Sequence, residues 1–316
     1  MIDPYKLRGK NFYHKISSER AKILEKFKKF LTSSKFPCYL CKSMDKKLKF
    51  IEVSKKYKLV KCRNCGLVSP NIDVLNTKNY TDIIYKDYSK NYHSISKKKN
   101  SKYRERLLEE RFRYFIKKNF KKFKKIKILE IGSGSGEFLK LLHKRKINYK
   151  GIEVDPRQLE YARSINLNVN NNSINDEKNN TYDLILMFDV LEHVVDPQKF
   201  VRIANKKLKK KGILISYMPN INSLSFKLMG GKHNLVYPYE HLNFFNKKSI
   251  NYLAKKTNFR VKKLETFGLD MIDYFFFREF NDKADYFSKI LKEINETQSY
   301  IDAIGEGNHY RLTLIK

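Results

Sequence analysis

The sequence predicts an α/β protein in which a doubly wound, mostly parallel sheet follows a small cysteine-rich unit. Three observations predict it. Short hydrophobic runs alternate with amphipathic helical segments from residue 126 onward, a glycine-rich turn closes the first of these runs, and all four cysteines lie within residues 38–65. Alternating strands and helices are typical of a parallel sheet with helices on both faces.

Length and composition set the limits of this prediction. The chain has 316 residues, enough for one large domain with an accessory unit, and 41% of them are hydrophobic, which supports a buried core. No apolar run approaches the roughly 18 to 20 residues that cross a bilayer, and the first residues lack the apolar stretch of a signal peptide. We therefore expect a cytoplasmic protein without a transmembrane segment, while the oligomeric state stays open.

The strong basic charge needs a separate explanation. A net charge of +34 can indicate a nucleic-acid or anionic-membrane partner. However, only 14 of the 67 basic residues are arginine, and the lysines are spread along the whole chain. RNA-binding surfaces more often use arginine, whose guanidinium forms paired hydrogen bonds and stacks on bases. The composition is typical of an AT-rich genome, and the densest lysine run, residues 117–127, is expected to be a solvated helix end.

The cysteines form two C-x2-C pairs, Cys38 with Cys41 and Cys62 with Cys65, separated by 20 residues. This spacing is typical of a four-thiolate zinc site, and the hydrophobic runs at 50–53 and 57–60 predict the strands of a zinc ribbon. A redox pair is the alternative, but no thioredoxin-like unit follows. Because four thiolates leave no open coordination position, we expect Zn²⁺ to be structural, serving folding and docking.

The strand at 126–131, the glycine-rich turn after it and the helix from residue 137 form one unit. Glycines at alternate positions let the backbone turn sharply and let a ligand approach closely, and the helix start offers free N–H groups to an anion. The candidate cofactor-binding residues here are Glu130, Gly132, Ser133, Gly134 and Gly136. Dinucleotide enzymes use a similar turn, but their spacing is G-x-G-x-x-G, whereas this turn is G-x-G-x-G after an acidic residue.

This motif resembles that of the class I S-adenosylmethionine-dependent methyltransferases, E/D-x-G-x-G-x-G. The resemblance implies a Rossmann-like, seven-stranded sheet and a turn that holds the methionine end of S-adenosylmethionine. A second strand at 149–156 ends in Glu153 and Asp155, and the resemblance favours Glu153 for the ribose hydroxyls over a merely solvated strand end. A third strand is expected at 167–169, with its following loop beside the adenine.

The fourth predicted strand, 182–188, ends in the segment Asp189-Val190-Leu191-Glu192-His193, which family members share in similar form. If a helix began here, Asp189, Glu192 and His193 would share one face. Three alternatives stay open: a helix start with a packing histidine, a side chain that faces the reacting hydroxyl, and a divalent metal site. Some relatives hold a metal with E-x-x-E-H and a later histidine, but Asp189 is shorter than the glutamate. We assign Asp189 to the cofactor site and His193 to the candidate catalytic set.

The fifth predicted strand, 213–220, is followed by Tyr237-Pro238-Tyr239-Glu240-His241. This segment resembles one shared by methyltransferases that act on sugars, quinones and other hydroxylated small molecules. In the sugar enzymes a Tyr-x-x-His pair removes a proton, but Pro238 occupies the tyrosine position here. We predict His241 as general base, with Tyr239 beside it; a packing histidine is the alternative.

The remaining segments complete the expected organisation. A sixth strand should start near 257–261, residues 271–300 should be helical and form a lid or a partner surface, and 309–315 should be the last, antiparallel strand. Tyr80, Tyr85, Tyr88 and Tyr92 are expected in a helical cap, where packing is the simpler role. The predicted divisions are a basic helical segment (1–36), the ribbon (37–68), the cap or linker (69–110) and the methyltransferase domain (111–316).

These patterns together predict an S-adenosylmethionine-dependent methyltransferase of a hydroxylated small molecule, such as a sugar, nucleotide-sugar or surface-glycan unit. The first alternative is an RNA methyltransferase that binds RNA through the ribbon and the lysines. The second is a cofactor-binding partner subunit without transfer activity. The acceptor atom (O, C or N) and a second metal at Asp189, Glu192, His193 and His241 are not decided by the sequence.

Overall fold

A seven-stranded sheet forms the centre of the protein, which we describe from a computed structural model covering residues 8–9, 11–31, 36–44, 48–75, 77, 80, 83–84 and 101–316. The strand order is β6-β5-β4-β7-β8-β10-β9, and only β10 runs antiparallel to its neighbours. The strands are β4 (Lys127–Ile131), β5 (Asn148–Ile152), β6 (Val169–Asn170), β7 (Tyr182–Phe188), β8 (Leu208–Pro219), β9 (Arg260–Phe267) and β10 (His309–Ile315). This arrangement confirms the predicted Rossmann-like sheet and its antiparallel last strand.

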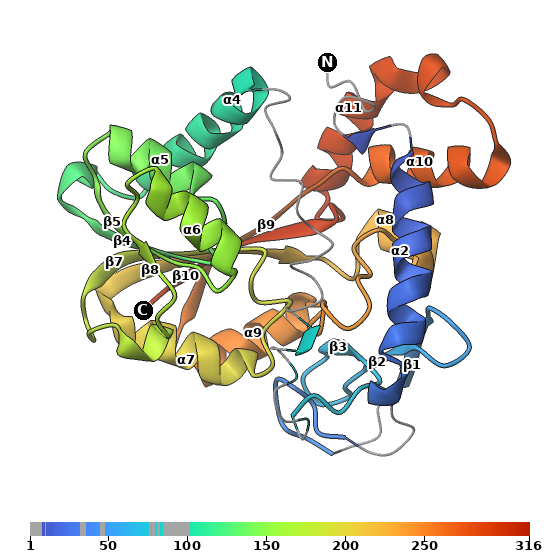
Figure 1. Cartoon of the computed structure of the whole chain (residues 1–316), viewed down its shortest axis with the longest axis horizontal. Helices are drawn as coiled ribbons and strands as arrows, with labels where there is room; N and C mark the ends of the chain where they lie inside the picture. The colour runs from blue at the N-terminus through green and yellow to red at the C-terminus, as the bar shows by residue number, and fades with distance from the viewer. Residues whose placement is uncertain are drawn as a thin grey trace.

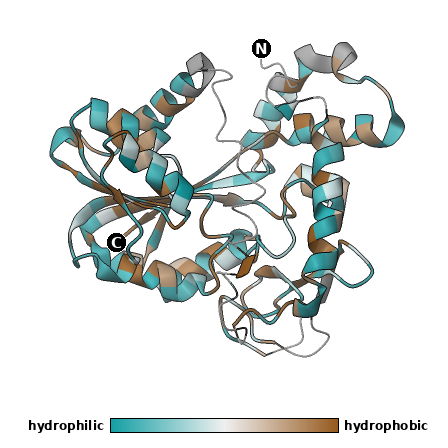
Figure 2. Ribbon diagram, viewed as in Figure 1, coloured by the Kyte–Doolittle hydropathy of each residue, from teal (hydrophilic) through white to brown (hydrophobic). Residues whose placement is uncertain are grey.

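Helices cover both faces of the sheet (Figure 1). One face carries α4 (Ser101–Phe112), α5 (Glu137–Lys144) and α6 (Pro156–Ser164); the other carries α7 (Pro197–Lys207) and α9 (Lys247–Lys256). The strands alternate accordingly, since Ile128 belongs to the first core and Leu129 and Ile131 to the second. Both faces are apolar, so the central strands are hydrophobic along their length, as Figure 2 shows.

The cysteine-rich unit is a separate antiparallel sheet of three short strands, β1 (Leu48–Glu52), β2 (Lys58–Lys61) and β3 (Val68–Pro70). Its buried side chains, Tyr39 and Tyr57 among them, belong to the same hydrophobic cluster as one face of the large sheet. A β-bridge joins Val68, in β3, to Phe244, in the segment before α9. The ribbon is therefore packed into the protein core rather than tethered to it.

A third cluster lies at the far end of the sheet from α6 (Figure 1). It packs α2 (Phe12–Lys26), α8 (Leu224–Met229), α10 (Asp270–Asp282) and α11 (Phe287–Ala303) through Tyr13, Met229 and Phe276. Single turns complete the chain: η1 (Lys28–Phe30), η2 (Arg113–Lys117), η3 (Phe123–Lys125), η4 (Ile174–Asp176) and η5 (Gly230–Lys232). Within the described residues no helix has both the length and the apolar character to span a membrane.

Most element predictions are confirmed, and the helix start that the sequence left open at Asp189 does not occur. The strands, the helices within 271–300 and the left-handed Asn258 (φ 57°) before β9 are as expected. No helix begins at Asp189: residues 189–196 form turns, and α7 begins at Pro197, where the Asp196 side chain accepts from the Lys199 amide. Proline at the first helical position and aspartate before it are a stronger start signal than two acids. Tyr85, Tyr88 and Tyr92 lie outside the described residues.

Candidate active site

The glycine turn joins β4 to α5 in a conformation that other residues resist. Gly132, Gly134 and Gly136 have φ values of 69°, 55° and 77°, in the left-handed region that costs a residue with a Cβ about 1–2 kcal/mol. A Cβ on Gly132 would lie 2.7 Å from Val190 Cγ2, and one on Gly136 would lie 2.4 Å from Leu167 Cδ1. Glycine is therefore required at both ends of this turn for packing as well as for conformation.

Glu130, in β4, and Ser133, in the turn, each carry a buried oxygen without a hydrogen-bond partner among the described residues. Glu130 is 4% exposed and Ser133 is 8% exposed, and neither Glu130 Oε2 nor Ser133 Oγ has a hydrogen-bond partner among the described residues. Burial raises the pKa of Glu130 to about 8, against the opposing charge of Arg111. Unpartnered buried polar atoms are costly, so they mark a place where a polar ligand completes the structure.

Glu153, at the end of β5, is held by the backbone. One of its carboxylate oxygens accepts from the Gly134 amide at 2.6 Å, and the other accepts from the Asp155 amide at 2.8 Å. Each oxygen keeps a second lone pair that can accept a ligand hydroxyl. Asp155 has a different task, because its side chain accepts from the Arg157 and Gln158 amides at the start of α6. Asp155 therefore caps α6, whereas Glu153 keeps lone pairs that a ligand can use.

A cavity of about 700 Å³ opens beside these residues at the carboxyl ends of β4, β5 and β7. Ligands of doubly wound sheets bind at this edge. Gly132, Glu153 and Asp189 line it, and residues 171–175 form its outer border, where the sequence predicts the adenine. Of the predicted site residues, His193 also lines this cavity, whereas Tyr239 and His241 do not.

Sequence reasoning missed Arg111, on α4. Its guanidinium carbon lies 5.0 Å from the centre of the Phe188 ring and 5.4 Å from that of Tyr217, and its charge opposes the raised pKa of Glu130. Its Nε has no hydrogen-bond partner among the described residues. The sequence feature that could have indicated Arg111 is the residue type itself. Arginine is a minority among the basic residues, and its planar guanidinium stacks on aromatic rings as lysine does not.

His193 and His241 meet although 48 positions separate them. Their ring centres lie 4.6 Å apart, nearly perpendicular. His193 Nδ1 donates to the Glu240 carbonyl at 3.1 Å, and His241 Nδ1 donates to the Leu235 carbonyl at 2.8 Å. These bonds fix the tautomer and leave each Nε2 with a free lone pair. Burial lowers the pKa of His193 to about 4 and that of His241 well below its usual value, so both rings are neutral at pH 7.

Glu192 completes a group with the two histidines. It is 1% exposed, its Oε2 has no hydrogen-bond partner among the described residues, and burial raises its pKa well above the usual value. One potential ligand atom each from Glu192, His193 and His241 lie within 4.8 Å of one another. A carboxylate and two imidazoles with fixed tautomers suit a divalent cation. Asp189 is not part of this group, because its backbone (φ 56°) belongs to an exposed turn rather than to a helix.

The four cysteines converge in the ribbon. Cys38 and Cys65 Sγ lie 3.5 Å apart, Cys41 and Cys62 Sγ lie 3.6 Å apart, and all four sulfurs lie within 4.8 Å of one another. None of the four is in a disulfide. A tetrahedron with Zn–S bonds of about 2.3 Å has edges of about 3.8 Å, so the thiolates fit Zn²⁺.

Tyr239 belongs to the turn of residues 237–241, here called the histidine turn, and does not line the cavity of about 700 Å³. Its ring packs against Phe27 and Tyr57, and its hydroxyl donates to the Leu24 carbonyl. Together with Tyr237 and Arg20 it lines a second cavity, of about 420 Å³, between α2 and residues 236–240. A catalytic role for Tyr239 stays a prediction, now attached to this second cavity.

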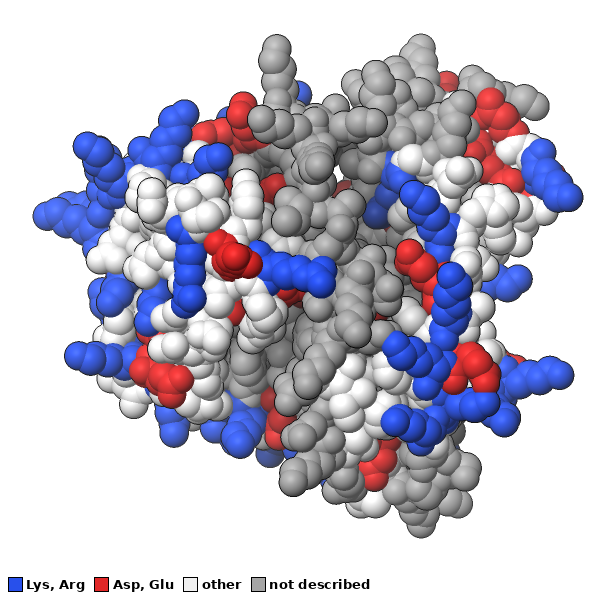
Figure 3. Space-filling model, in the orientation of Figure 1, with Lys and Arg blue, Asp and Glu red and all other residues white. Residues whose placement is uncertain are grey.

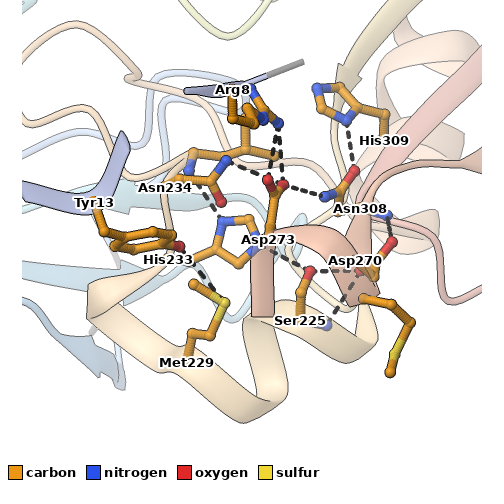
Figure 4. Close-up of polar contacts among 12 residues, drawn as sticks. Arg8, Tyr13, Ser225, Met229, His233, Asn234, Asp270, Asp273, Asn308 and His309 are labelled. Carbon is orange, nitrogen blue, oxygen red and sulfur yellow. Dashed lines mark hydrogen bonds and ion pairs between the residues drawn. The ribbon is translucent and has the colours of Figure 1, made fainter. Parts of the chain in front are cut away.

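A buried polar network anchors the segment that leads to the histidine turn (Figure 4). His233 Nε2 donates to Ser225 Oγ at 2.8 Å, while its Nδ1 accepts from the Leu235 amide at 3.0 Å. Asp273, beside it, forms an ion pair with Arg8 at 2.9 Å. The Leu235 amide is bonded to His233 and the Leu235 carbonyl to His241, so this network holds in place the residue that orients His241.

The chain is similar in sequence to a methyltransferase family model and to curated methyltransferases, and in structure to a solved protein. A sequence model of the family described as "Methyltransferase domain" matches residues 101–264. The "Ubiquinone biosynthesis O-methyltransferase" of Pelagibacter ubique is 25% identical over 191 residues, covering 56% of this chain and 79% of the relative. Its counterpart from Rickettsia typhi is 24% identical over 204 residues, covering 60% and 82%. Among solved structures, the PH0226 protein of Pyrococcus horikoshii aligns with a TM-score of 0.48 at 16% identity, covering 72% of this chain and 98% of that chain.

Proposed function

The chain belongs to the methyltransferase domain family and is an S-adenosylmethionine-dependent methyltransferase, and we propose that its acceptor is a hydroxylated small molecule. The observation that carries this proposal is the neutral His241, held by Leu235 with a free Nε2, in contact with His193 at the edge of the cavity of about 700 Å³. An unprotonated imidazole nitrogen in a buried site can take the proton of a hydroxyl as the methyl group is transferred.

The cavity of about 700 Å³, here called the cofactor cavity, and the residues beside it offer groups that match each end of S-adenosylmethionine, which supplies an electrophilic methyl group when bound. We assign the unpartnered Glu130 to the ammonium, Arg111 to the carboxylate and Glu153 to the ribose hydroxyls. The turn glycines leave room for the methionine end, and Asp189 with residues 171–175 borders the adenosine. Fixed dipoles and charges of this kind hold the donor in place, and positioning is the main contribution to catalysis.

We assign the acceptor to the cavity between α2 and residues 236–240. Its volume of about 420 Å³ suits a small molecule. Its walls combine Ile16, Phe27 and Val236 with Tyr237, Tyr239 and the cation Arg20, a mixture that packs on the apolar side of a ring and bonds its polar edge. A sugar, nucleotide-sugar or glycan unit fits this mixture. The relatives' names concern ubiquinone biosynthesis, so a hydroxylated quinone precursor is the second candidate.

A divalent cation is a second way to activate the hydroxyl. The cluster of Glu192, His193 and His241 supports it, because one potential ligand atom from each residue lies within 4.8 Å of the others and both Nε2 lone pairs are free. A cation held there would lower the pKa of a bound hydroxyl without proton uptake by His241. Metal analysis of purified wild-type protein against Glu192→Gln separates the two, because only the cation arrangement predicts metal beyond that held by the cysteines.

No described feature favours an RNA acceptor. Lysines 117–125 are exposed, as expected of a solvated helix end. Figure 3 shows basic side chains at both sides of the visible face, with acidic ones among them. An electrostatic footprint for nucleic acid is a continuous patch.

The experiment that tests the proposal is a screen of metabolite and glycan extracts with methyl-labelled S-adenosylmethionine, followed by identification of the labelled product. We expect an O-methylated small molecule. Label in RNA only, or on nitrogen or carbon only, would contradict the proposal. Binding of S-adenosylmethionine without transfer to any fraction would instead favour the partner-subunit alternative.

A further inference from the structure

The turn that carries His241 is built around a residue in an unusual conformation. The Tyr237 carbonyl accepts from the amides of Glu240 (3.3 Å) and His241 (3.0 Å), which closes the turn. Between them, Tyr239 has a φ of 70°, a left-handed conformation that is unfavourable for a bulky side chain. Such a conformation persists only where surrounding contacts hold it.

Tyr57 and Tyr80 supply those contacts from distant parts of the chain. The Tyr239 amide donates to the Tyr57 hydroxyl at 3.2 Å, and the Tyr80 hydroxyl donates to the Tyr239 carbonyl at 2.8 Å. Tyr57 is fully buried and its ring packs edge-on against that of Tyr239, at 5.2 Å between centres. Both backbone groups of Tyr239 are therefore held by side chains, one from the zinc ribbon and one from the segment that follows it.

The neighbouring peptide groups hold the histidines. The Glu240 carbonyl, one residue after Tyr239, accepts from His193 Nδ1 at 3.1 Å. His241 follows directly, and its ring touches that of His193. A rotation of the peptide groups flanking Tyr239 would move both the Glu240 carbonyl, which accepts from His193, and the backbone of His241. The two would move together because Glu240 and His241 follow Tyr239 directly in the chain.

We infer that the ribbon is a positioning element of the active site: Tyr57 holds Tyr239 left-handed, and this conformation sets the places of His193 and His241. The inference rests on the proposed function, since it assigns the histidines to the reacting centre. It extends the structural role predicted for the zinc site, because the metal would then organise the catalytic turn as well as fold the ribbon. Tyr57 touches neither cofactor cavity nor reacting atoms, so it is a positioning residue rather than a catalytic one.

The test compares Tyr57→Phe with Tyr39→Phe. Each substitution removes one hydroxyl from a fully buried ribbon tyrosine, and the Tyr39 hydroxyl donates to the Ile72 carbonyl at 2.6 Å, away from the histidine turn. Both variants should lower the melting temperature by a similar amount, because each loses one buried hydrogen bond. We expect only Tyr57→Phe to lower kcat, by about tenfold, with the KM for S-adenosylmethionine unchanged.

A second readout does not require the acceptor. Ring-nitrogen NMR of the histidines reports the tautomers and hydrogen bonds of His193 and His241 directly. We expect their signals to shift in Tyr57→Phe and to stay in place in Tyr39→Phe. Equal changes in both variants, or unchanged histidine signals in Tyr57→Phe, would overturn the inference. If the histidine signals shift as expected and no hydroxyl acceptor is ever found, the proposed function fails while the positioning role stands.

Discussion

The cofactor turn and the histidine turn lie on two sides of one site, and they are held in different ways. The cofactor turn is local, because Glu130, Gly132 and Gly136 are near neighbours in sequence and Glu153 is tied to Gly134 by a backbone hydrogen bond. The histidine turn depends on Tyr57 and Tyr80, which are 182 and 159 residues away from Tyr239. The cofactor turn is therefore encoded in one βαβ unit, whereas the histidine turn takes its conformation only after the ribbon has docked.

The largest effect should come from the acceptor side. Replacing His241 with alanine removes the free Nε2 beside His193, and loss of a positioned base typically costs 10²–10⁴-fold in rate. We expect a fall in kcat of this size with the affinity for S-adenosylmethionine retained, measured by transfer of labelled methyl to the identified acceptor. The control is His143→Ala, at an exposed position of α5. Full turnover by His241→Ala would remove His241 from the mechanism.

On the donor side, Gly136→Ala should be the most damaging single change. It combines left-handed strain with a Cβ 2.4 Å from Leu167 Cδ1, for a cost of about 2–4 kcal/mol. The matched control is Gly305→Ala, since Gly305 has a φ of 84° but its nearest neighbour would lie 3.7 Å away. We expect both variants to lower the melting temperature and only Gly136→Ala to weaken cofactor binding strongly. Equal cofactor affinities would show that the turn does not depend on this close packing.

A smaller loss is expected from Arg111→Met, which keeps much of the side-chain packing and removes the charge. Loss of a charge-assisted hydrogen bond costs about 1.5–3 kcal/mol, so the affinity for S-adenosylmethionine should fall by about tenfold or more. Arg106→Met, on the same helix, removes only an exposed ion pair with Glu110 and serves as the control. If titration calorimetry gave the same affinity for both variants, the cofactor carboxylate would lie elsewhere.

A separate prediction concerns the pH dependence of stability without cofactor. Because burial raises the pKa of Glu130 to about 8, its contribution is complete below pH 4.5 and is lost as pH rises towards 8, at about 1.4 kcal/mol for each pKa unit. The melting temperature of the wild-type protein should decline across this window, and that of Glu130→Gln should decline less. Glu160→Gln, at an exposed position of α6, should follow the wild type. Parallel curves for Glu130→Gln and the wild type would contradict the burial argument.

The same contrast explains what could be predicted from the sequence. The sheet, the glycine turn and the cysteine cluster follow from spacing within short windows, and these were predicted. The placement of Tyr239 was not, because a tyrosine at φ 70° has no local signal and depends on Tyr57 and Tyr80. The helix start that the sequence left open at Asp189 does not occur, because acidic side chains alone do not start a helix when Asp196-Pro197 does so eight residues later. Arg111 was not singled out because the chain has 67 basic residues and no motif marks this one.

The most direct test of this account is the Cys62→Ser variant, which disrupts the ribbon but changes no residue of the cofactor turn or of the histidine cluster. Calorimetric binding of S-adenosylmethionine and the single-turnover rate of methyl transfer are measured on the same sample. We predict an affinity within about twofold of wild type, as expected for independent sites, together with a strongly reduced transfer rate. Loss of cofactor binding and transfer in equal measure, or full transfer without the ribbon's metal, would contradict the account.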